Sequence, residues 1–424
     1  MFCKATLVTV ALALLASAGP LVEQRSEPIS IPLAKRSSLT KEDGTFNHDK
    51  AVLHNVKIQN KYRQNLINLQ QNKGLEAFNE GAEIKPLAVV PASIPASIQK
   101  RQKESLVDQE SDTEWTGTVT IGSNSQSFVI DFDTGSSDLW VPNASKCTGC
   151  SGKHTYTSTA STTSKSQSGS FSIQYGDGST VSGPIFKDTV TVAGIKATSQ
   201  SFSAVTSLSS LFNDDPIDGI LGLAFQDISN LNAAPFFQNA FAEGAVPSNV
   251  FAFKLASSGS ELYLGGTNTA LYTGAIEYHT VTSSGFWQAT GAKALVGTKA
   301  VVSGFDTIID SGTTIMYGPP AAVKTFYAAI PGSKVYDSSN GYYSYPCSTP
   351  PTVGFSWGGK TWAISSTNFN LGQTTTGSTQ CVGALAGQDL GLGSNVWLLG
   401  DSFMKNVYTA FNFDTNSVGF ATLK

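Results

Sequence analysis

Two stretches of the sequence, VIDFDTGSSDLWV at residues 129–141 and TIIDSGTTIMYGP at residues 307–319, follow one pattern. In each, apolar residues lead to an aspartate (Asp133 or Asp310), which is followed by a hydroxyl residue, a glycine and another hydroxyl residue. An Ile-Leu-Gly ends 89 residues after the first aspartate, and a Leu-Leu-Gly ends 90 residues after the second. Two copies of the same pair of motifs, at nearly the same spacing, indicate an internal duplication. The sequence therefore predicts two related halves, each with one Asp-hydroxyl-Gly turn.

The region that surrounds these turns has the composition of a β protein. From about Trp115 onward the chain is rich in Gly, Ser, Thr and Val, with short alternating stretches such as TGTVTIG and DTVTVAG. Alternation of this kind is typical of strands. The best helical patterns are APFFQNAFAEG and PAAVKTFYAAI. We therefore expect a mainly β body with a few short helices.

The two turns offer a specific chemistry if an approximate two-fold axis relates the halves. Asp133 and Asp310 would then meet, and Gly135 and Gly312 would let backbone N–H groups approach the carboxylates. Two carboxylates in contact cannot both ionise cheaply, so they share one proton. One can act as a base on water while the other polarises a carbonyl group. Hydroxyl groups that could orient the carboxylates or join the turns belong to Thr134, Ser136, Ser311 and Thr313.

Other functions fit the sequence less well. Residues 354–358 match the G-x-S-x-G pattern of serine hydrolases, but no helical pattern follows and no histidine occurs after His279. The four histidines offer no metal-ligand pair, so we expect neither a metal nor a cofactor. A glycosidase also uses two carboxylates, but it separates them around a sugar bond. A single Asp-Ser-Gly turn is often structural, whereas the paired copies favour catalysis.

Several motifs together resemble a known family, the pepsin-like aspartic proteases of the secreted fungal type. DFDTGSSDLWVP, YGDGS, DGILGLAF, IIDSGTT and WLLGDSFMKNVYTAFNFDTNSVGFA follow that pattern in order and cover essentially all of residues 115–424. The resemblance implies a bilobal β fold with a cleft between an N-terminal lobe (107–275) and a C-terminal lobe (276–424). It also implies a monomeric acid endopeptidase that cleaves polypeptides between bulky apolar residues.

The resemblance assigns further expected roles. Ser136 and Thr313 would hydrogen-bond the aspartates, and Thr134 and Ser311 would lock the two turns together. The expected substrate-binding residues are Tyr175, Gly176 and Asp177 of a β-hairpin flap, together with Asp131, Leu211 and Thr314, and Trp140 would support the flap. Asp177 would admit a substrate lysine. Ordinary structural roles remain open for Tyr175, Trp140, Asp131 and Asp177.

The first 101 residues differ from the rest. Residues 1–18 have the basic start, apolar run and small-residue cleavage site of a signal peptide, so we expect secretion. Residues 1–101 carry a formal charge of +5, and the remainder carries −9. The acidic remainder disfavours nucleic-acid binding. The opposite charges favour a basic leader (19–101) that is bound by an acidic body. Lys100-Arg101 is a candidate processing site. By resemblance, Lys61 would reach the catalytic carboxylates and Tyr62 would cover one, until acid releases the leader.

Four cysteines remain after the signal peptide, which suggests two disulfides. Three pairings are possible in principle; Cys147–Cys150 and Cys347–Cys381 are favoured because each closes a local loop, and the family resemblance supports them. Asn143 begins an N-glycosylation sequon.

Overall fold

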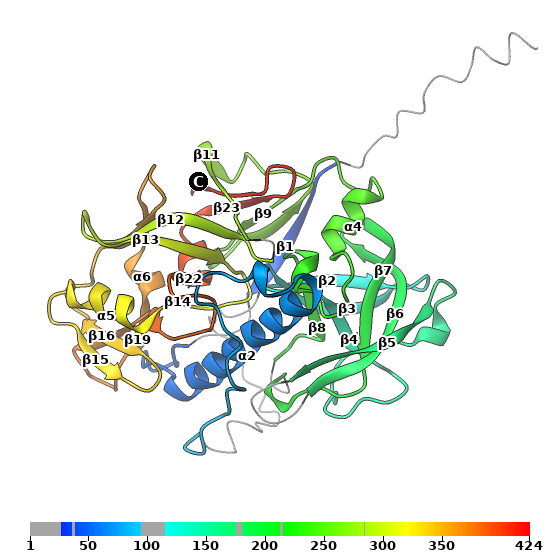
Figure 1. The fold of residues 1–424 in the computed structure, drawn as a ribbon, viewed down its shortest axis with the longest axis horizontal. Coiled ribbons are helices and arrows are strands. Elements are labelled where there is room, and N and C mark those ends of the chain that lie inside the picture. Colours follow the sequence, from blue (N-terminus) through cyan, green and yellow to red (C-terminus); the bar gives the residue numbers. More distant parts are fainter. Residues whose placement is uncertain (1–26, 36–38, 95–114, 175–179, 213–214, 284) are drawn as a thin grey trace, which may run out of the picture.

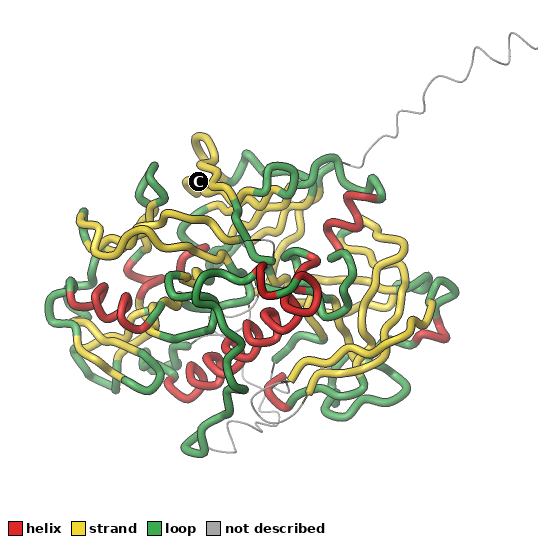
Figure 2. The backbone as a smooth tube through the Cα atoms, viewed as in Figure 1, coloured by secondary structure: helices red, strands yellow, loops and turns green. Residues whose placement is uncertain are grey.

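The computed structural model describes residues 27–35, 39–94, 115–174, 180–212, 215–283 and 285–424. Figure 1 shows two β-rich parts, and helix α2 (His48–Lys73) runs between them. The same arrangement is visible in Figure 2, where strands predominate on both sides of this helix. The fold is therefore mainly β and bilobal, as the sequence predicts.

A 13-stranded sheet extends from the N-terminal lobe to the C-terminal end of the chain. Its middle contains a strand of the leader, β1 (Ile29–Lys35), which pairs antiparallel with both neighbours. The predicted lobe boundary at 275/276 falls within β11, at one edge of this sheet. In sheet order the strands are β11 (Tyr272–Thr280), β24 (Ser417–Leu423), β23 (Tyr408–Asn412), β9 (Val250–Lys254), β10 (Ser260–Leu264), β1, β2 (Trp115–Ile121), β3 (Gln126–Asp133), β8 (Gly219–Gly222), β4 (Leu139–Pro142), β7 (Ile195–Val205), β6 (Thr180–Val192) and β5 (Lys165–Gln174).

Two further sheets belong to the C-terminal half. The first has seven strands, in the order β18 (Trp362–Ile364), β17 (Val353–Ser356), β12 (Gln288–Val296), β13 (Lys299–Ile309), β22 (Val396–Leu399), β14 (Met316–Gly318) and β21 (Leu385–Gly387). The second has four, in the order β15 (Lys334–Asp337), β16 (Tyr342–Pro346), β20 (Gln380–Gly383) and β19 (Asn370–Gln373).

The duplication appears in the strand pairing around the two aspartates. β3 ends in Asp133 and pairs in parallel with β8, the Ile-Leu-Gly strand. β13, which immediately precedes Asp310, pairs in parallel with β22, the strand of the Leu-Leu pair. Both glycines are required by close packing, because a Cβ on Gly222 would lie 2.4 Å from the backbone nitrogen of Ser137 and one on Gly400 would lie 1.9 Å from the carbonyl oxygen of Thr313. The repeated motifs are therefore one repeated strand arrangement.

Short helices complete the body. The two stretches with helical patterns form α4 (Phe236–Ala242) and α5 (Pro320–Ala328), as predicted. The other short helices are α6 (Ser366–Phe369), α7 (Asp401–Met404) and the 3-10 turns η1 (Leu75–Ala77), η2 (Ser158–Ala160), η3 (Ser210–Phe212) and η4 (Gln226–Ile228).

Helix α2 is the long helix of the leader, with 26 residues. The side chain of Asn47 accepts a hydrogen bond from the backbone of Lys50 at its start, and Gly74 ends it with a positive φ of 91°. One face carries buried apolar residues that join the main core of the body: Ala51, Ile58, Tyr62, Leu66 and Leu69. Their three-, four- and seven-residue spacing is that of a single helix face. The leader is therefore packed into the body as part of its core.

Both predicted disulfides are present, Cys147–Cys150 and Cys347–Cys381. The first lies beside the buried apolar cluster of the N-terminal lobe that includes Trp140. The second joins the segment that follows β16 to β20 of the four-stranded sheet. Each disulfide therefore stabilises one lobe rather than the contact between lobes.

Candidate active site

The two aspartates lie at equivalent places and are held by equivalent donors. Asp133 is 2% exposed, and its carboxylate accepts hydrogen bonds from the backbone N–H of Gly135 at 2.8 Å and the hydroxyl of Ser136 at 2.6 Å. Asp310 is fully buried and accepts from the N–H of Gly312 at 2.9 Å and from the hydroxyl of Thr313 at 2.5 Å. Each carboxylate is thus fixed by its own turn.

The two turns are also joined to each other by reciprocal hydrogen bonds. The backbone N–H of Thr134 donates to the Ser311 hydroxyl at 3.0 Å, and the N–H of Ser311 donates to the Thr134 hydroxyl at 2.9 Å. The two hydroxyls in turn donate across the interface, Thr134 to the carbonyl of Ile309 at 3.0 Å and Ser311 to that of Phe132 at 2.7 Å. Four buried hydrogen bonds therefore set the position of one lobe's turn relative to the other.

Each glycine of these turns lies against the carboxylate of the opposite half. A Cβ on Gly135 would be 2.4 Å from Asp310 Oδ1, and one on Gly312 would be 2.3 Å from Asp133 Oδ1. A side chain at either position would therefore displace a carboxylate. The turns require glycine because the two aspartates meet between them.

A cation and a phenol from the leader lie on this pair. The ammonium of Lys61 donates to Asp133 Oδ1 at 2.8 Å and to Asp310 Oδ2 at 2.9 Å. The hydroxyl of Tyr62 donates to Asp310 Oδ2 at 2.8 Å, and its side chain is fully buried. Both side chains therefore lie directly on the two aspartates, and their inhibitory role stays a prediction.

The surroundings shift the pKa values of the two carboxyl groups in opposite directions. Burial raises the pKa of Asp133, and the neighbouring Asp310 charge adds to this effect while Lys61 opposes it. Burial also acts to raise the pKa of Asp310, but the Lys61 charge and the hydrogen bond from Thr313 outweigh it and lower that pKa. Two identical side chains in contact, with pKa values moved apart, are suited to hold one proton between them.

The predicted flap is a hairpin of β5 and β6, but its tip lies outside the described residues. Tyr175, Gly176 and Asp177 therefore cannot be placed, and their roles stay predictions. The rest of the region forms a separate apolar cluster that contains Trp140 and Phe212, with ring centroids 5.3 Å apart, and Leu211 packs against it. Trp140 thus shares a cluster with Phe171 of β5 and Val181 of β6, and its role in supporting the flap stays a prediction.

Two further predicted substrate-binding residues have identified contacts. The buried carboxylate of Asp131 accepts a hydrogen bond from the backbone N–H of Trp115 at 3.3 Å. The N–H of Thr314 donates to the ring of His54 in α2 at 3.3 Å, and its buried hydroxyl has no hydrogen-bond partner among the described residues. Thr314 therefore lies under the leader helix.

The structure supplies less support for the predicted glycosylation and processing sites. Asn143 is only 8% exposed, and its amide nitrogen lies 3.4 Å from the carbonyl oxygen of Ala204, so the folded geometry gives no support to glycosylation there. Lys100 and Arg101 lie outside the described residues. Within the described ranges, no cluster of His, Cys, Asp or Glu could hold a metal ion, and no helix is both long and apolar enough to span a membrane.

Asparagines of α2 make contacts that the sequence analysis did not identify. The side-chain amides of Asn65, Asn68 and Asn72 donate to the carbonyl oxygens of Gly135, Ile228 and Ser229 at 2.8, 2.9 and 2.9 Å. Their spacing along the helix places them on one face, which is the signal that could have revealed them. The leader is thus bound through neutral groups as well as through charges.

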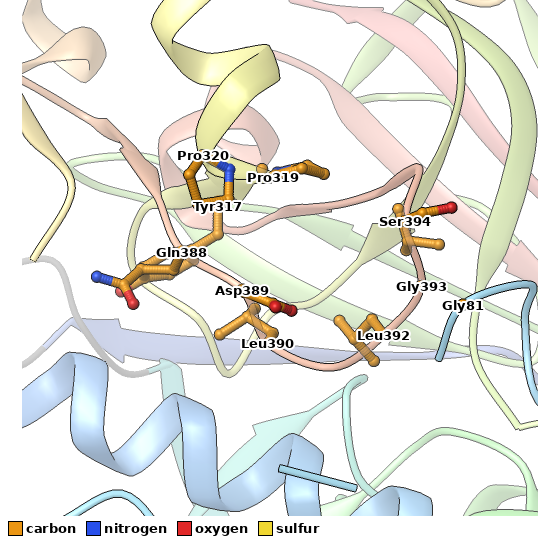
Figure 3. A pocket seen from close by; sticks show the side chains of 12 residues that line it. Gly81, Tyr317, Pro319, Pro320, Gln388, Asp389, Leu390, Leu392, Gly393 and Ser394 are labelled. Carbon is orange, nitrogen blue, oxygen red and sulfur yellow. The ribbon is translucent and has the colours of Figure 1, made fainter. Parts of the chain in front are cut away.

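After α2, the leader continues along the C-terminal lobe. The N–H of Glu83 donates to the carbonyl of Gly391 at 2.9 Å, and the N–H of Ser394 donates to the carbonyl of Glu80 at 3.1 Å. A cavity of about 230 Å³ remains here, and Gly81 of the leader lines it together with Leu390 and Leu392 of the body (Figure 3). The leader therefore covers the body well beyond the two aspartates.

Comparison with known proteins agrees with this geometry. The family model described as eukaryotic aspartyl protease matches residues 114–423. An aspartic protease of Phaffia rhodozyma is 48% identical over 323 residues, which cover 74% of this chain and 78% of the relative. Major aspartyl peptidase 1 of Cryptococcus neoformans is 34% identical over 393 residues (84% and 80%), and endothiapepsin of Cryphonectria parasitica is 38% identical over 315 residues (72% and 74%).

A paired-carboxylate site between two related β lobes, together with these matches, defines an aspartic endopeptidase. The chain belongs to the eukaryotic aspartyl protease family, in its pepsin-like fungal branch.

Proposed function

We propose that Asp133 and Asp310 are the catalytic pair of a secreted acid endopeptidase that is made as a zymogen. The observation that carries the catalytic part is the reciprocal geometry of the two turns, in which each carboxylate has its own backbone and hydroxyl donor and lies against the other turn's glycine. Such fixed donors hold reacting groups in place before a substrate arrives.

In the active form the leader is gone, so the pair loses the Lys61 charge and retains one proton. The ionised carboxylate takes a proton from a water molecule between the two side chains, and the water oxygen attacks the peptide carbonyl carbon. The protonated carboxyl group donates a hydrogen bond to the carbonyl oxygen as negative charge develops there. The carboxyl group that took the proton from water then transfers it to the amide nitrogen. The C–N bond breaks, and the amine is released.

The zymogen proposal rests on the position of the leader. Residues 1–18 are the proposed signal peptide, residues 19–101 the inhibitory leader, and 107–275 and 276–424 the two lobes. Lys61 and Tyr62 occupy the place where water and the peptide carbonyl would react. A leader bound in this way blocks catalysis directly, and a cut after Lys100-Arg101 followed by acid would remove it.

For specificity, we propose subsites for bulky apolar residues, with Leu211, Thr314 and Asp131 near the bound chain and Tyr175 and Gly176 on the flap. Asp177 is the proposed partner of a substrate lysine. The substitution Asp177→Ser should lower the ratio of cleavage at lysine-containing sites to cleavage at apolar sites. An equal loss at both kinds of site would contradict this role.

The function is tested by incubating the purified full-length chain at acid pH with a denatured protein, with and without a statine-type peptide. Such a peptide places a hydroxyl where the tetrahedral intermediate has its oxygens and should abolish cleavage. Absence of turnover, or hydrolysis of a polysaccharide in its place, would overturn the proposal.

A further inference from the structure

A second acidic site lies near the catalytic pair, on the loop that follows η3 of the N-terminal lobe. There the ammonium of Lys57, from the leader, lies 2.6 Å from Asp215 Oδ2 and 4.8 Å from the centre of the Phe212 ring. Both partners of this ion pair are 21% exposed. A carboxylate and an aromatic face together make a receptor for a cationic side chain.

Asp215 and Phe212 also have contacts within the body. The ammonium of Lys153 donates to the carbonyl oxygens of Asp215 and Ile217, the latter at 2.8 Å. The N–H of Asp215 donates to the carbonyl of Phe212 at 3.3 Å, and Phe212 packs edge-on against Trp140. None of these contacts involves a residue of the leader.

The position of the receptor relative to the catalytic pair follows from the helix. Lys57 and Lys61 are four residues apart on α2, so they share one face and are separated by about 6 Å along the axis. Lys61 lies on both catalytic carboxylates. An extended chain covers the same distance in about two residues. A substrate side chain within about two residues of the bond to be cut can therefore reach Asp215.

The surroundings favour lysine over other side chains. Phe212 belongs to the apolar cluster of Trp140, Phe171 and Leu208, and the Lys57 ammonium lies over its ring. A methylene chain can pack along that ring. The ammonium at its end would then reach Asp215, as that of Lys57 does now. In the leader-bound form His54 of α2 also faces this charge, and both His54 and Lys57 depart with the leader.

We propose that Asp215 and Phe212 form a subsite for a substrate lysine close to the bond that is cut, and that Lys57 fills this subsite in the zymogen. This inference rests on the proposed function and adds to it a second specificity-determining site, on the body rather than on the flap. It is distinct from the flap aspartate, because Asp215 belongs to a different loop and already binds a lysine in the structure.

The test uses mature enzyme obtained from the full-length chain and pairs of peptides that differ by one residue, lysine or norleucine. Norleucine keeps the methylene chain and lacks the charge. The variable residue is placed in turn at each of the three positions on either side of the cleaved bond. The measured quantity is the ratio of kcat/KM for the lysine peptide to that for the norleucine peptide, at pH 5 and low salt.

We expect wild type to show a ratio of about 10 at one position, and Asp215→Asn to bring it to about 1. Asp227→Asn is the matched control, because Asp227 is also 21% exposed and pairs with a leader lysine, Lys73, but 16 residues further along α2. It should leave the ratio unchanged. Asp215→Lys should reverse the preference, so that a glutamate peptide is cleaved faster than the lysine peptide.

The outcomes separate the two proposals. If wild type cleaves both peptides and Asp215→Asn leaves the ratio unchanged at every position, the subsite is overturned while the endopeptidase function stands. Equal losses on both peptides would show a structural role for Asp215 and would also overturn the subsite. If wild type cleaves neither peptide, the proposed function is wrong and the subsite with it.

Discussion

At the scale of single residues, a threonine and a serine join the two aspartate turns across the interface between the lobes. Thr134 and Ser311 are fully buried, and each both donates and accepts across the interface between the lobes. A buried backbone N–H or carbonyl group that loses such a partner still bears the free-energy cost of its removal from water, and no hydrogen bond offsets that cost. The hydroxyl of Thr134 therefore stabilises the relative position of the catalytic turns.

Substitution of Thr134 by valine should lower the free energy of unfolding by about 2–4 kcal/mol, because it leaves the Ser311 N–H and the Ile309 carbonyl without partners. Denaturant unfolding measures this change. Thr409→Val is the control, since the buried Thr409 hydroxyl has no hydrogen-bond partner among the described residues. Its loss should cost less than about 1 kcal/mol. Equal costs for the two variants would be inconsistent with the interlock.

At the scale of elements, helix α2 combines groups that respond to acid with groups that do not. Burial, together with the positive charges of Lys57, Lys61 and Lys50, lowers the pKa of His54 from 6.5 to about 3. His54 is therefore neutral while the leader is bound and regains its ordinary pKa once released. Between pH 6.5 and pH 3, His54 binds a proton in the released leader but not in the bound leader. Binding of the leader to the body is therefore strongest above pH 6.5 and weakens as the pH falls.

If His54 contributes to acid release in this way, His54→Gln should lower the pH of half-maximal activation by about half a unit or more, because glutamine keeps an acceptor for the Thr314 N–H but does not titrate. Activation is followed as cleavage of a denatured protein after preincubation at each pH. His48→Gln is the control, since His48 is a histidine of the same helix that contacts Asp337 at 2.7 Å rather than Thr314. A midpoint that does not move in His54→Gln would exclude this role.

The asparagines of the same helix should oppose release at every pH, because amides do not titrate. The substitution Asn65→Ala removes the hydrogen bond to the Gly135 carbonyl and leaves that buried acceptor without its partner. It should accelerate activation at mildly acid pH, by about 5-fold or more. Gln64→Ala is the neighbouring control, since the Gln64 side-chain amide donates within the leader, to Asn68 at 2.9 Å. Unchanged activation in Asn65→Ala would show that the charges alone hold the leader.

Sequence patterns were sufficient to predict the features that follow from short motifs and their spacing along the chain. The Asp-hydroxyl-Gly turns, their glycines and the partner strands were all predictable, because a repeated motif at a repeated spacing implies a repeated strand arrangement. The length of α2 and its asparagine contacts were not, because Asn65 and Asn68 are poor helix formers that gain stability only from carbonyls 70 and 160 residues away. Asp215 was missed for the same reason, since only the docked helix brings Lys57 to it.

At the scale of the whole molecule, the leader is part of both the central sheet and the core, and the two disulfides lie in the body. Cys347–Cys381 closes a loop of 34 residues and Cys147–Cys150 one of three. In a chain-entropy model, the longer loop accounts for about 4 kcal/mol and the shorter one for about 2 kcal/mol. Unfolding of the two double Cys→Ser variants measures the difference. A greater loss from the 147/150 variant would contradict this ranking.

We propose that two carboxylates from two related lobes act as one catalytic pair, and the variant Asp310→Asn tests this proposal. The variant and wild type are treated identically to remove the leader, and N-terminal sequencing confirms the removal. Asp306→Asn, four residues earlier and bonded to Gln288, serves as the matched control. We predict that Asp310→Asn lowers kcat/KM on a denatured protein at acid pH by at least about 100-fold, whereas the control stays within about 2-fold of wild type. Undiminished cleavage by folded Asp310→Asn would contradict the catalytic pair.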